Sequence, residues 1–425
     1  MLEDLLESFI PLFLLVCVNL AVIFRRIGKL KVPAWTAFMI AALIIILIQP
    51  GAYDRAIVVI GTNVHVLIFL FGMFVLVTSL DISGSLEERG KFLLLKGESP
   101  LGLLFSIHFG LGLAASLLVN DTVAIIGPTL LIAFTKQVRK YPKPYILAVC
   151  YALTFGSALL PTGNPQNYIL AIAGDISFLE FGIWALFPTF FSLLGSYILL
   201  KYLLKSEFNE IKFPVIPAIA EKHELESLQR PSEVFFIVLV IGLILSSFIT
   251  QISITLIILL ITGTFLFLVN ERDKILEKLN WEVILFFMGM FVVLDAVVSS
   301  NFFVNIISPF LNQLDFNFTS LVIFIIILFL LSQVLSNVPV AILIAGILPR
   351  TPLDHPLFWM TAALTTTFAG ATTVLGAASN IIVIDIAAER GVEITWWEFT
   401  KFGIPISILS LIPILSIGLL FFILG

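Results

Sequence analysis

The chain has 425 residues and a formal net charge of −5; 60% of its residues are hydrophobic, 12% are charged, and the mean hydropathy is +1.12. A soluble protein of this length needs far more charge, so the composition excludes a soluble globular fold and indicates an integral membrane protein. The two cysteines, Cys17 and Cys150, lie in apolar segments and indicate neither a disulfide framework nor a zinc site. The sequence has no Walker A loop, so ATP-driven pumping by this chain alone is unsupported.

Long apolar segments separated by charged loops predict an all-α polytopic membrane protein, at about 20 residues per crossing. The ten predicted transmembrane spans lie near residues 9–24, 33–48, 57–80, 145–173, 182–204, 234–249, 254–269, 282–300, 358–387 and 402–424.

Two further apolar regions, 100–135 and 319–348, do not fit single crossings. Their second arms, Val123–Phe134 and Val338–Leu348, are roughly 16–18 Å long at helical rise, against a hydrocarbon core of about 30 Å. We therefore expect two re-entrant hairpins, each of which enters the membrane, turns near the midplane and leaves on the same side.

Two of the predicted spans contain a polar turn that predicts a break at the midplane. Residues 161–167 (Pro-Thr-Gly-Asn-Pro-Gln-Asn) interrupt the span 145–173, and residues 375–380 (Leu-Gly-Ala-Ala-Ser-Asn) interrupt the span 358–387. Gly163 permits backbone angles closed to other residues, and Asn164 with Pro165 predicts an N-cap and the start of a second half-helix. Unwound backbone is tolerated in a membrane only where it is buried in protein or lines a watery cavity. Paired broken helices of this kind indicate a transporter binding site.

The lysine and arginine residues predict the orientation of the chain. With ten spans and two hairpins, all 23 of them except Arg55 and Arg350 fall on one side, which the positive-inside rule assigns to the cytoplasm. Both termini then lie outside. The hairpin 100–135 opens to the cytoplasm and the hairpin 319–348 opens outside.

This assignment predicts two repeats of inverted topology, residues 1–204 and 234–425, joined by a charged cytoplasmic linker, 205–233. Sequence echoes at nearly constant spacing support the pairing. They are Phe71-Gly72-Met73-Phe74 with Met288-Gly289-Met290-Phe291, Asn120 with Asn337, and Glu180-Phe181 with Glu398-Phe399.

The hairpin tips, Val119-Asn120-Asp121-Thr122 and Ser336-Asn337-Val338-Pro339, are short polar turns followed by apolar helices. Side-chain oxygens and freed carbonyls there can coordinate Na⁺, and the positive helix N-termini can face an anion; the alternative is that these residues only cap the helices. A carboxylate in the membrane interior is costly, so we interpret Asp121 as a proton carrier or coupling-cation ligand, with an N-cap role as the alternative. Its counterpart in the second half is the neutral Val338.

The candidate substrate-binding or ion-binding residues are those of the two tips and the two breaks. They are Asn120, Asp121, Thr122, Thr162, Gly163, Asn164, Gln166, Asn167, Ser336, Asn337, Val338, Thr373, Gly376, Ser379 and Asn380. The candidate Na⁺ ligands among them are Asn120, Asp121, Gly163, Asn337 and Gly376. His108, Asp295 and Asp385 rank lower, since structural hydrogen bonding explains each of them as well. No arginine or lysine lies near the four polar turns, so an anion there would be held by amides, hydroxyls, helix N-termini and a co-bound cation.

Four motifs together resemble the ion transporter superfamily. They are Asn120-Asp121-Thr122 followed by Pro128, Gly163-Asn164-Pro165-Gln166-Asn167, Ser336-Asn337-Val338-Pro339, and Gly376-Ala377-Ala378-Ser379-Asn380. That group holds the divalent anion/sodium symporters, citrate-transporter-like permeases, arsenite-efflux membrane subunits and a class of sodium/proton antiporters. The tip Asn-Asp-Thr departs from the Ser-Asn-Thr typical of the dicarboxylate symporters and looks closer to the arsenite-efflux and citrate-like branches.

The resemblance implies paired hairpins, two broken helices, two sodium-type sites flanking one substrate, and usually a homodimer that works by an elevator movement. We therefore expect a secondary active transporter of a small inorganic or organic anion in the cell membrane, coupled to Na⁺ or H⁺. The alternatives are a sodium/proton antiporter and a passive anion channel. We expect no enzymatic activity, no catalytic residues, no cofactor besides a coupling Na⁺, and no nucleic-acid partner. In the arsenite-efflux branch a soluble ATPase subunit docks on the cytoplasmic face, and nothing in this sequence supports one.

Overall fold

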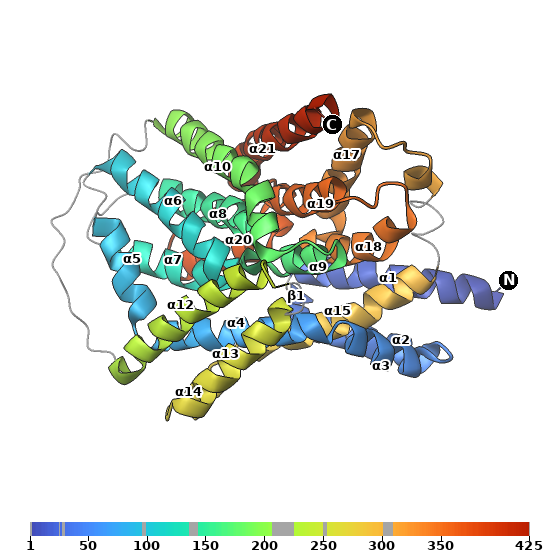
Figure 1. The fold of residues 1–425 in the computed structure, drawn as a ribbon, viewed down its shortest axis with the longest axis horizontal. Helices are drawn as coiled ribbons and strands as arrows, with labels where there is room; N and C mark the ends of the chain where they lie inside the picture. The colour runs from blue at the N-terminus through green and yellow to red at the C-terminus, as the bar shows by residue number, and fades with distance from the viewer. Residues whose placement is uncertain are drawn as a thin grey trace.

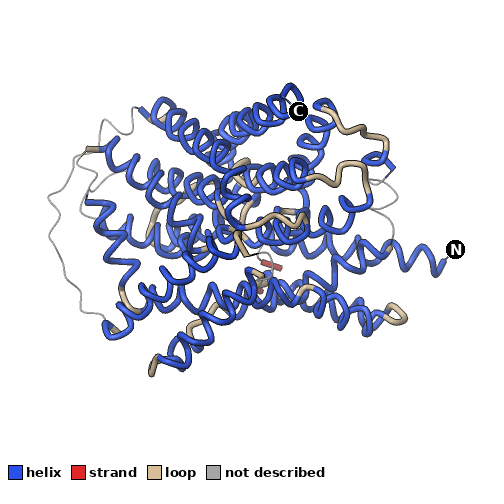
Figure 2. Tube along the Cα trace, in the orientation of Figure 1, coloured by secondary structure: helices blue, strands red, loops and turns tan. Residues whose placement is uncertain are grey.

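The computed structural model describes residues 2–24, 26–27, 30–95, 99–135, 143–205, 225–249, 253–300 and 309–424. This part of the chain is helical, apart from a two-stranded antiparallel sheet, β1 (Arg26–Ile27) and β2 (Leu30–Lys31), between the first two helices (Figure 2). The all-helical prediction is therefore confirmed in outline, and the small sheet is a feature that the sequence did not predict.

The helices of the first half are α1 (Leu2–Phe24), α2 (Ala34–Ile48), α3 (Ala52–Thr62), α4 (Val64–Ile82), α5 (Ser85–Leu95), α6 (Pro100–Leu118), α7 (Asn120–Thr135), α8 (Lys143–Gly156), α9 (Pro165–Ala173) and α10 (Phe178–Leu203). Those of the second half are α12 (Gln229–Ser246), α13 (Ile254–Leu268), α14 (Arg272–Glu277), α15 (Trp281–Ser299), α17 (Phe318–Leu335), α18 (Asn337–Ile347), α19 (Pro356–Ala369), α20 (Ala378–Glu389) and α21 (Trp396–Leu424).

Within the described ranges, seven helices are long and apolar enough to cross a membrane. They are Val64–Ile82, Pro100–Leu118, Phe178–Leu203, Glu226–Ser246 (the 3-10 turn Glu226–Leu228 continued by α12), Trp281–Ser299, Phe318–Leu335 and Trp396–Leu424. Shorter apolar helices cover further predicted spans, among them Ala34–Ile48 and Ile254–Leu268. The chain is a multi-pass membrane protein, whereas the count of ten spans, the re-entrant hairpins and the inverted orientation stay predictions.

The predicted span 57–80 is wrong in its boundaries, because two helices, α3 and α4, occupy this region. Near the end of α3, Thr62 Oγ1 donates to the Val58 carbonyl (2.9 Å) and Asn63 Nδ2 donates to the Val59 carbonyl (2.8 Å). Side chains that bond nearby backbone in this way compete with the helix, and Asn63 (φ −96°, ψ 12°) leaves the helical region.

Two other boundaries also differ from the prediction. The helix α12 begins at Gln229, inside the predicted linker 205–233, while linker residues 206–224 lie outside the described part of the chain. The second arm of the first hairpin begins at Asn120 instead of Val123, so that Asp121 and Thr122 lie in its first helical turn.

Both hairpin tips are sharp turns between two helices. Val119 joins α6 to α7 with φ 66°, and Ser336 joins α17 to α18 with φ 67°. Positive φ is unusual for any residue with a Cβ and costs about 1–3 kcal/mol, so such positions cluster at functional sites. The turns place Asn120 and Asn337 at the first position of the helix that follows each tip.

The echo of Gly72 and Gly289 marks two close helix contacts. A Cβ on Gly72 of α4 would overlap with Ile258 of α13, and a Cβ on Gly289 of α15 would lie 2.9 Å from the Met39 amide nitrogen of α2. Glycine is required because the helices approach closely at both points. The helices α1–α4 and α12–α15 are called the scaffold below.

The two broken segments, α8–α9 and α19–α20, lie inside the molecule with the two hairpins, α6–α7 and α17–α18, around them. Figure 1 shows them between α10 and α21 on one side and the scaffold on the other. The hairpins and the broken segments together are called the core unit below. The breaks are irregular backbone with short 3-10 turns, η1 (Ser157–Leu159) and η2 (Pro161–Gly163) in the first segment and η5 (Val374–Gly376) in the second.

Candidate functional site

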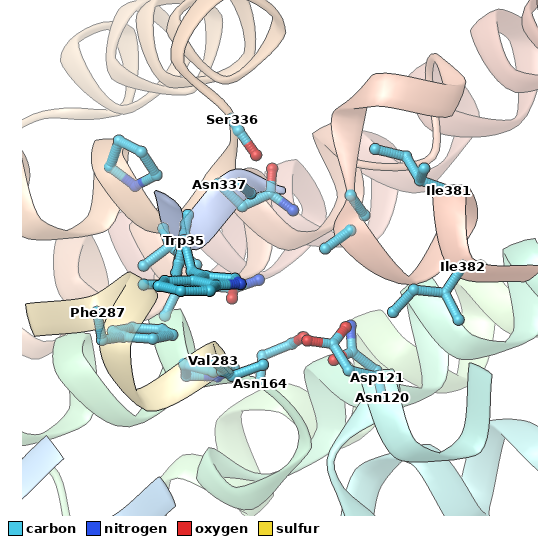
Figure 3. Close-up of a pocket in the computed structure, with 18 of the residues that line it drawn as sticks. Trp35, Asn120, Asp121, Asn164, Val283, Phe287, Ser336, Asn337, Ile381 and Ile382 are labelled. Carbon is cyan, nitrogen blue, oxygen red and sulfur yellow. The ribbon is translucent and has the colours of Figure 1, made fainter. Parts of the chain in front are cut away.

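A cavity of about 440 Å³ lies where the N-terminal ends of α7, α9, α18 and α20 meet the scaffold helices α2 and α15. Its polar lining consists of Asn19, Trp35, Asn120, Asp121, Asn164, Gln166, Asn280, Glu282, Gln333, Ser336 and Asn337. Figure 3 shows Asn120 and Asp121 on one wall, Ser336 and Asn337 on another, and Trp35 and Phe287 on the scaffold side. Both hairpin tips and both breaks therefore contribute to one partly open cavity.

The predicted site residues divide into two groups in the structure. Those that line the cavity are Asn120, Asp121, Asn164, Gln166, Ser336, Asn337 and Val338. Those that lie outside its lining are Thr122, Thr162, Gly163, Asn167, Thr373, Gly376, Ser379 and Asn380. The second group contains the residues that hold the broken backbone in place, and their predicted binding role stays a prediction.

The two breaks are held by the same pattern of side-chain hydrogen bonds. Asn167 Nδ2 donates to backbone carbonyls ten and seven residues earlier, at 3.0 and 3.3 Å. Asn380 Nδ2 donates to carbonyls at the same two separations, at 2.8 and 3.3 Å. The side-chain oxygens accept from the opposite segment, Asn167 Oδ1 from Thr367 Oγ1 (2.9 Å) and Asn380 Oδ1 from Thr154 Oγ1 (3.3 Å). Each asparagine thus satisfies carbonyls that its break has freed and ties the two broken segments together.

Glycine at each break allows the chain to fold back on itself. A Cβ on Gly163 would overlap with the Ser157 carbonyl oxygen, and a Cβ on Gly376 would lie 2.7 Å from the Gly370 carbonyl oxygen. Asn164 occupies the N-cap position of α9 as predicted, but its side chain makes no capping bond. Asn164 Nδ2 donates to Ser157 Oγ (2.6 Å) instead.

The hairpin tips contact the breaks through buried polar groups. Asn120 Nδ2 lies 3.4 Å from Ser379 Oγ, and Gln333 Nε2 donates to the Ala369 carbonyl (3.1 Å). Thr162 Oγ1 donates to the Ser116 carbonyl of α6 (2.8 Å). These bonds fix the tips against the breaks from which the cavity is built.

Several buried polar atoms of the cavity lining have no hydrogen-bond partner in the described chain. They are Asn120 Oδ1, Asn337 Oδ1, Gln333 Oε1 and Trp35 Nε1. Asn120 is 6% exposed and Asn337 is 5% exposed, so solvent does not readily satisfy these amides. Buried polar groups in proteins are almost always paired, and clustered exceptions at a cavity indicate where a ligand binds.

The charged side chains that line the cavity are acidic, whereas the helix N-termini that point to it carry partial positive charge. Asp121 and Glu282 line it, whereas no lysine, arginine or histidine of the described residues does. Asp121 has no hydrogen-bond or ion-pair partner within the described ranges. The N-termini of α7, α9, α18 and α20 contribute partial positive charge, which offsets the carboxylates.

Sequence reasoning missed the scaffold side of the cavity, which consists of Asn19, Trp35, Asn280 and Glu282 together with apolar residues of α2 and α15. These residues lie near the predicted ends of spans, where a membrane-interface position explains them equally well. No local signal in the sequence shows that two distant helix ends meet the hairpin tips.

The lower-ranked candidates lie away from the cavity lining, which excludes His108, Asp295 and Asp385. His108 is buried between helices, with Nδ1 3.3 Å from the Ala148 carbonyl and Nε2 2.7 Å from Ser196 Oγ. The described residues contain no group of three or more His, Cys, Asp or Glu side chains that could hold a metal ion.

The helical architecture and the polar cavity between broken helices define a multi-pass membrane transporter. The family model described as Citrate transporter matches residues 19–366, and the chain belongs to that family. This finding confirms the resemblance to the ion transporter superfamily, and it makes the protein a transporter and not an enzyme.

Relatives of the chain carry related descriptions. The 46 kDa membrane protein of Mycobacterium leprae is 25% identical over 366 residues, covering 83% of this chain and 85% of the relative. The silicon efflux transporter LSI3 of Oryza sativa subsp. japonica is 21% identical, covering 93% of this chain and 94% of the relative. The putative transporter arsB of Dictyostelium discoideum is 23% identical, covering 82% and 81%.

A solved structure, that of the YdaH transporter of Alcanivorax borkumensis, is similar in fold. It superposes with a TM-score of 0.57 at 15% sequence identity and covers 97% of both chains. At this identity the similarity concerns the fold alone.

Proposed function

We propose that the protein is a secondary active transporter that moves a small oxygen-rich anion, or the protonated form of that anion, and is coupled to a Na⁺ or H⁺ gradient. The observation that carries the proposal is the meeting of four helix N-termini with buried, unpartnered amide oxygens and the Asp121 carboxylate in one cavity. The descriptions of the matching family and of the rice relative name citrate and silicon, and in water these exist as small oxygen-rich species, a carboxylate and silicic acid.

The proposed substrate is held without basic side chains. Helix N-termini and amide N–H groups would carry the interaction with an anion, and their N–H groups can also donate to an uncharged acid. The proposed coupling-cation ligands are Asn120 Oδ1 and Asn337 Oδ1, with Asp121 nearby, because amide and carboxylate oxygens are the donors that hard cations prefer. If protons are the coupling ion instead, Asp121 is the proposed carrier.

The proposed movement is an elevator motion of the core unit against the scaffold, with the cavity at the boundary between them. We propose the orientation given by the positive-inside rule in the cell membrane, with both termini outside. A homodimer is the proposed assembly.

The test is a transport assay in proteoliposomes with labelled citrate, silicic acid and arsenite, with and without Na⁺, at two internal pH values. Accumulation of one solute against its gradient, only when Na⁺ or H⁺ is supplied, supports the proposal. Solute flux that only follows the gradient of the solute itself, without Na⁺ or H⁺, would instead support a passive channel. Sodium-dependent proton flux without any of the solutes would support a sodium/proton antiporter, for which the unpaired Asp121 carboxylate is the motivating observation.

Replacing Asp121 sharpens the coupling assignment. Asp121→Asn should abolish gradient-driven accumulation while solute exchange continues, because the amide neither binds a proton nor neutralises a cation at neutral pH. The matched control is Asp295→Asn, a carboxylate outside the cavity lining, which should retain coupling. Unchanged coupling and an unchanged pH profile in Asp121→Asn would remove Asp121 from this role.

A further inference from the structure

Trp35 lies in the first turn of α2 and presents a buried indole N–H that has no acceptor among the described residues. It lines the cavity from the scaffold side, and Figure 3 shows its ring across the open space from Asn120 and Asp121. The indole nitrogen is a donor only, so only an acceptor atom can satisfy it.

Other tryptophans of the chain have acceptors for the same group. Trp359 Nε1 donates to Asp354 Oδ1 (2.8 Å), and Trp281 Nε1 donates to the Leu276 carbonyl (2.9 Å). Trp35 is the one tryptophan whose Nε1 is buried without a partner in the described part of the chain. Tryptophan is placed where its N–H reaches a partner when it is buried, so a partner that binds in the cavity is the expected explanation.

The opposite wall of the cavity offers the complementary groups. Asn120 Oδ1 and Asn337 Oδ1 are unpartnered acceptors that belong to the core unit, whereas Trp35 Nε1 is an unpartnered donor that belongs to the scaffold. A single ligand that satisfies all three must present an oxygen lone pair to the indole, and hydroxyl protons or a bound cation to the amides. Small oxyacids and cation-paired oxyanions have both kinds of group.

We propose that Trp35 donates its Nε1–H to an oxygen of the transported solute and is a residue that determines affinity and selectivity from the scaffold side. This inference rests on the proposed transport function and adds a binding residue outside the hairpin tips and breaks. It places one recognition residue on a helix that does not belong to the core unit.

The test compares Trp35→Phe with Trp397→Phe in the same proteoliposome assay, with citrate and silicic acid as probes. Trp397 is 67% exposed and does not line the cavity. Trp35→Phe should raise KM by about 3- to 10-fold, the range expected for the loss of one hydrogen bond, with little change in maximal rate. The KM of the control, Trp397→Phe, should stay unchanged. An unchanged KM in a Trp35→Phe protein that still transports would overturn the proposal while leaving the transport function intact.

A second variant removes only the donor. Incorporation of 3-benzothienylalanine at position 35 replaces the N–H by sulfur in a ring of nearly the same shape, so folding and packing should be preserved. The same rise in KM is expected. A normal KM with sulfur in place of the N–H would show that only the ring's bulk matters and would also overturn the proposal. If the wild-type protein transports neither probe under any gradient, the proposed function fails first, which is a distinguishable result.

Discussion

The two faces that the scaffold turns toward the core unit differ. On one face, Trp35 in the first turn of α2 opens onto the cavity. On the other, Thr255 in the first turn of α13 accepts or donates a hydrogen bond with the Tyr168 hydroxyl of α9 (2.6 Å), and the Tyr168 ring stacks on Phe69 of α4 at 4.0 Å. One face is therefore open at its polar centre and the other is closed by a packed aromatic contact.

A movement of the proposed kind would act on the closed face. An alternating-access cycle needs one side of the binding site open while the other is closed, and then the reverse. Interfaces of packed side chains favour discrete arrangements, so each face is expected to switch between an open and a closed state. We therefore expect the contact of Tyr168 with Thr255 and Phe69 to separate when the cavity closes.

The largest expected effect comes from tethering the closed face. A Tyr168→Cys/Thr255→Cys protein joined by a short bifunctional thiosulfonate should lose nearly all transport, because the contact could no longer separate. Transport should return on reduction. The background would carry Cys17→Ser, while Cys150 is buried and can stay. Full transport by a protein shown to be cross-linked would exclude this face from the cycle.

A smaller effect is expected from the asparagines that hold the breaks. Asn380→Ala removes both carbonyl bonds at the second break and leaves buried acceptors unpaired, at a cost of about 2–4 kcal/mol. A fall in the thermal unfolding temperature in detergent measures this, and Asn167→Ala should give a similar fall. Asn317→Ala is the control, because the exposed side chain of this N-cap residue of α17 accepts from the Ser320 amide (2.9 Å), and its loss should cost about 1 kcal/mol. A fall no larger than that of the control would show that the break does not depend on its asparagine.

The smallest expected effect comes from the Tyr168 hydroxyl alone. Tyr168→Phe removes one hydrogen bond from the closed face, which shifts the balance of the two states toward opening by about 2- to 10-fold. The rate at which a water-soluble thiol reagent labels His65→Cys, whose native ring lies 6.2 Å from that of Tyr168, should rise by this factor. Tyr145→Phe, which loses a bond to the Pro100 carbonyl (3.1 Å) elsewhere, should leave the labelling rate unchanged. Equal rates in both variants would argue against a gating role of the hydroxyl.

The hairpin tips and the breaks could be predicted from the sequence because their signals are local. Gly163 and Pro165 interrupt a helix wherever they occur in this arrangement, and the short polar turn at Asn337 precedes an apolar run too short to cross the membrane. The break at Asn63 could not be predicted in the same way, because it depends on side chains that bond the preceding turn and not on proline or glycine.

The sequence could not predict which polar residues line the cavity and which bond the backbone of the breaks. Asn167 and Asn380 belong to the same motifs as Asn164 and Gln166, yet their amides turn inward to the carbonyls of the breaks. Trp35 was missed because its place in the cavity depends on the packing of α2 against α15, which brings the first turn of α2 to the hairpin tips. Such contacts between distant segments carry no periodicity that a single sequence reveals.

The proposed function requires that the transported solute binds in the cavity between the core unit and the scaffold. The most direct test is the rate at which a water-soluble maleimide labels Ile125→Cys, a cavity-lining position that is 44% exposed, with and without saturating solute. Labelling of Glu393→Cys, in the exposed loop between α20 and α21, provides the reference. Solute is expected to slow labelling at position 125 and to leave labelling at position 393 unchanged. Equal labelling of Ile125→Cys with and without a solute that the protein demonstrably transports would show that the solute does not bind in this cavity.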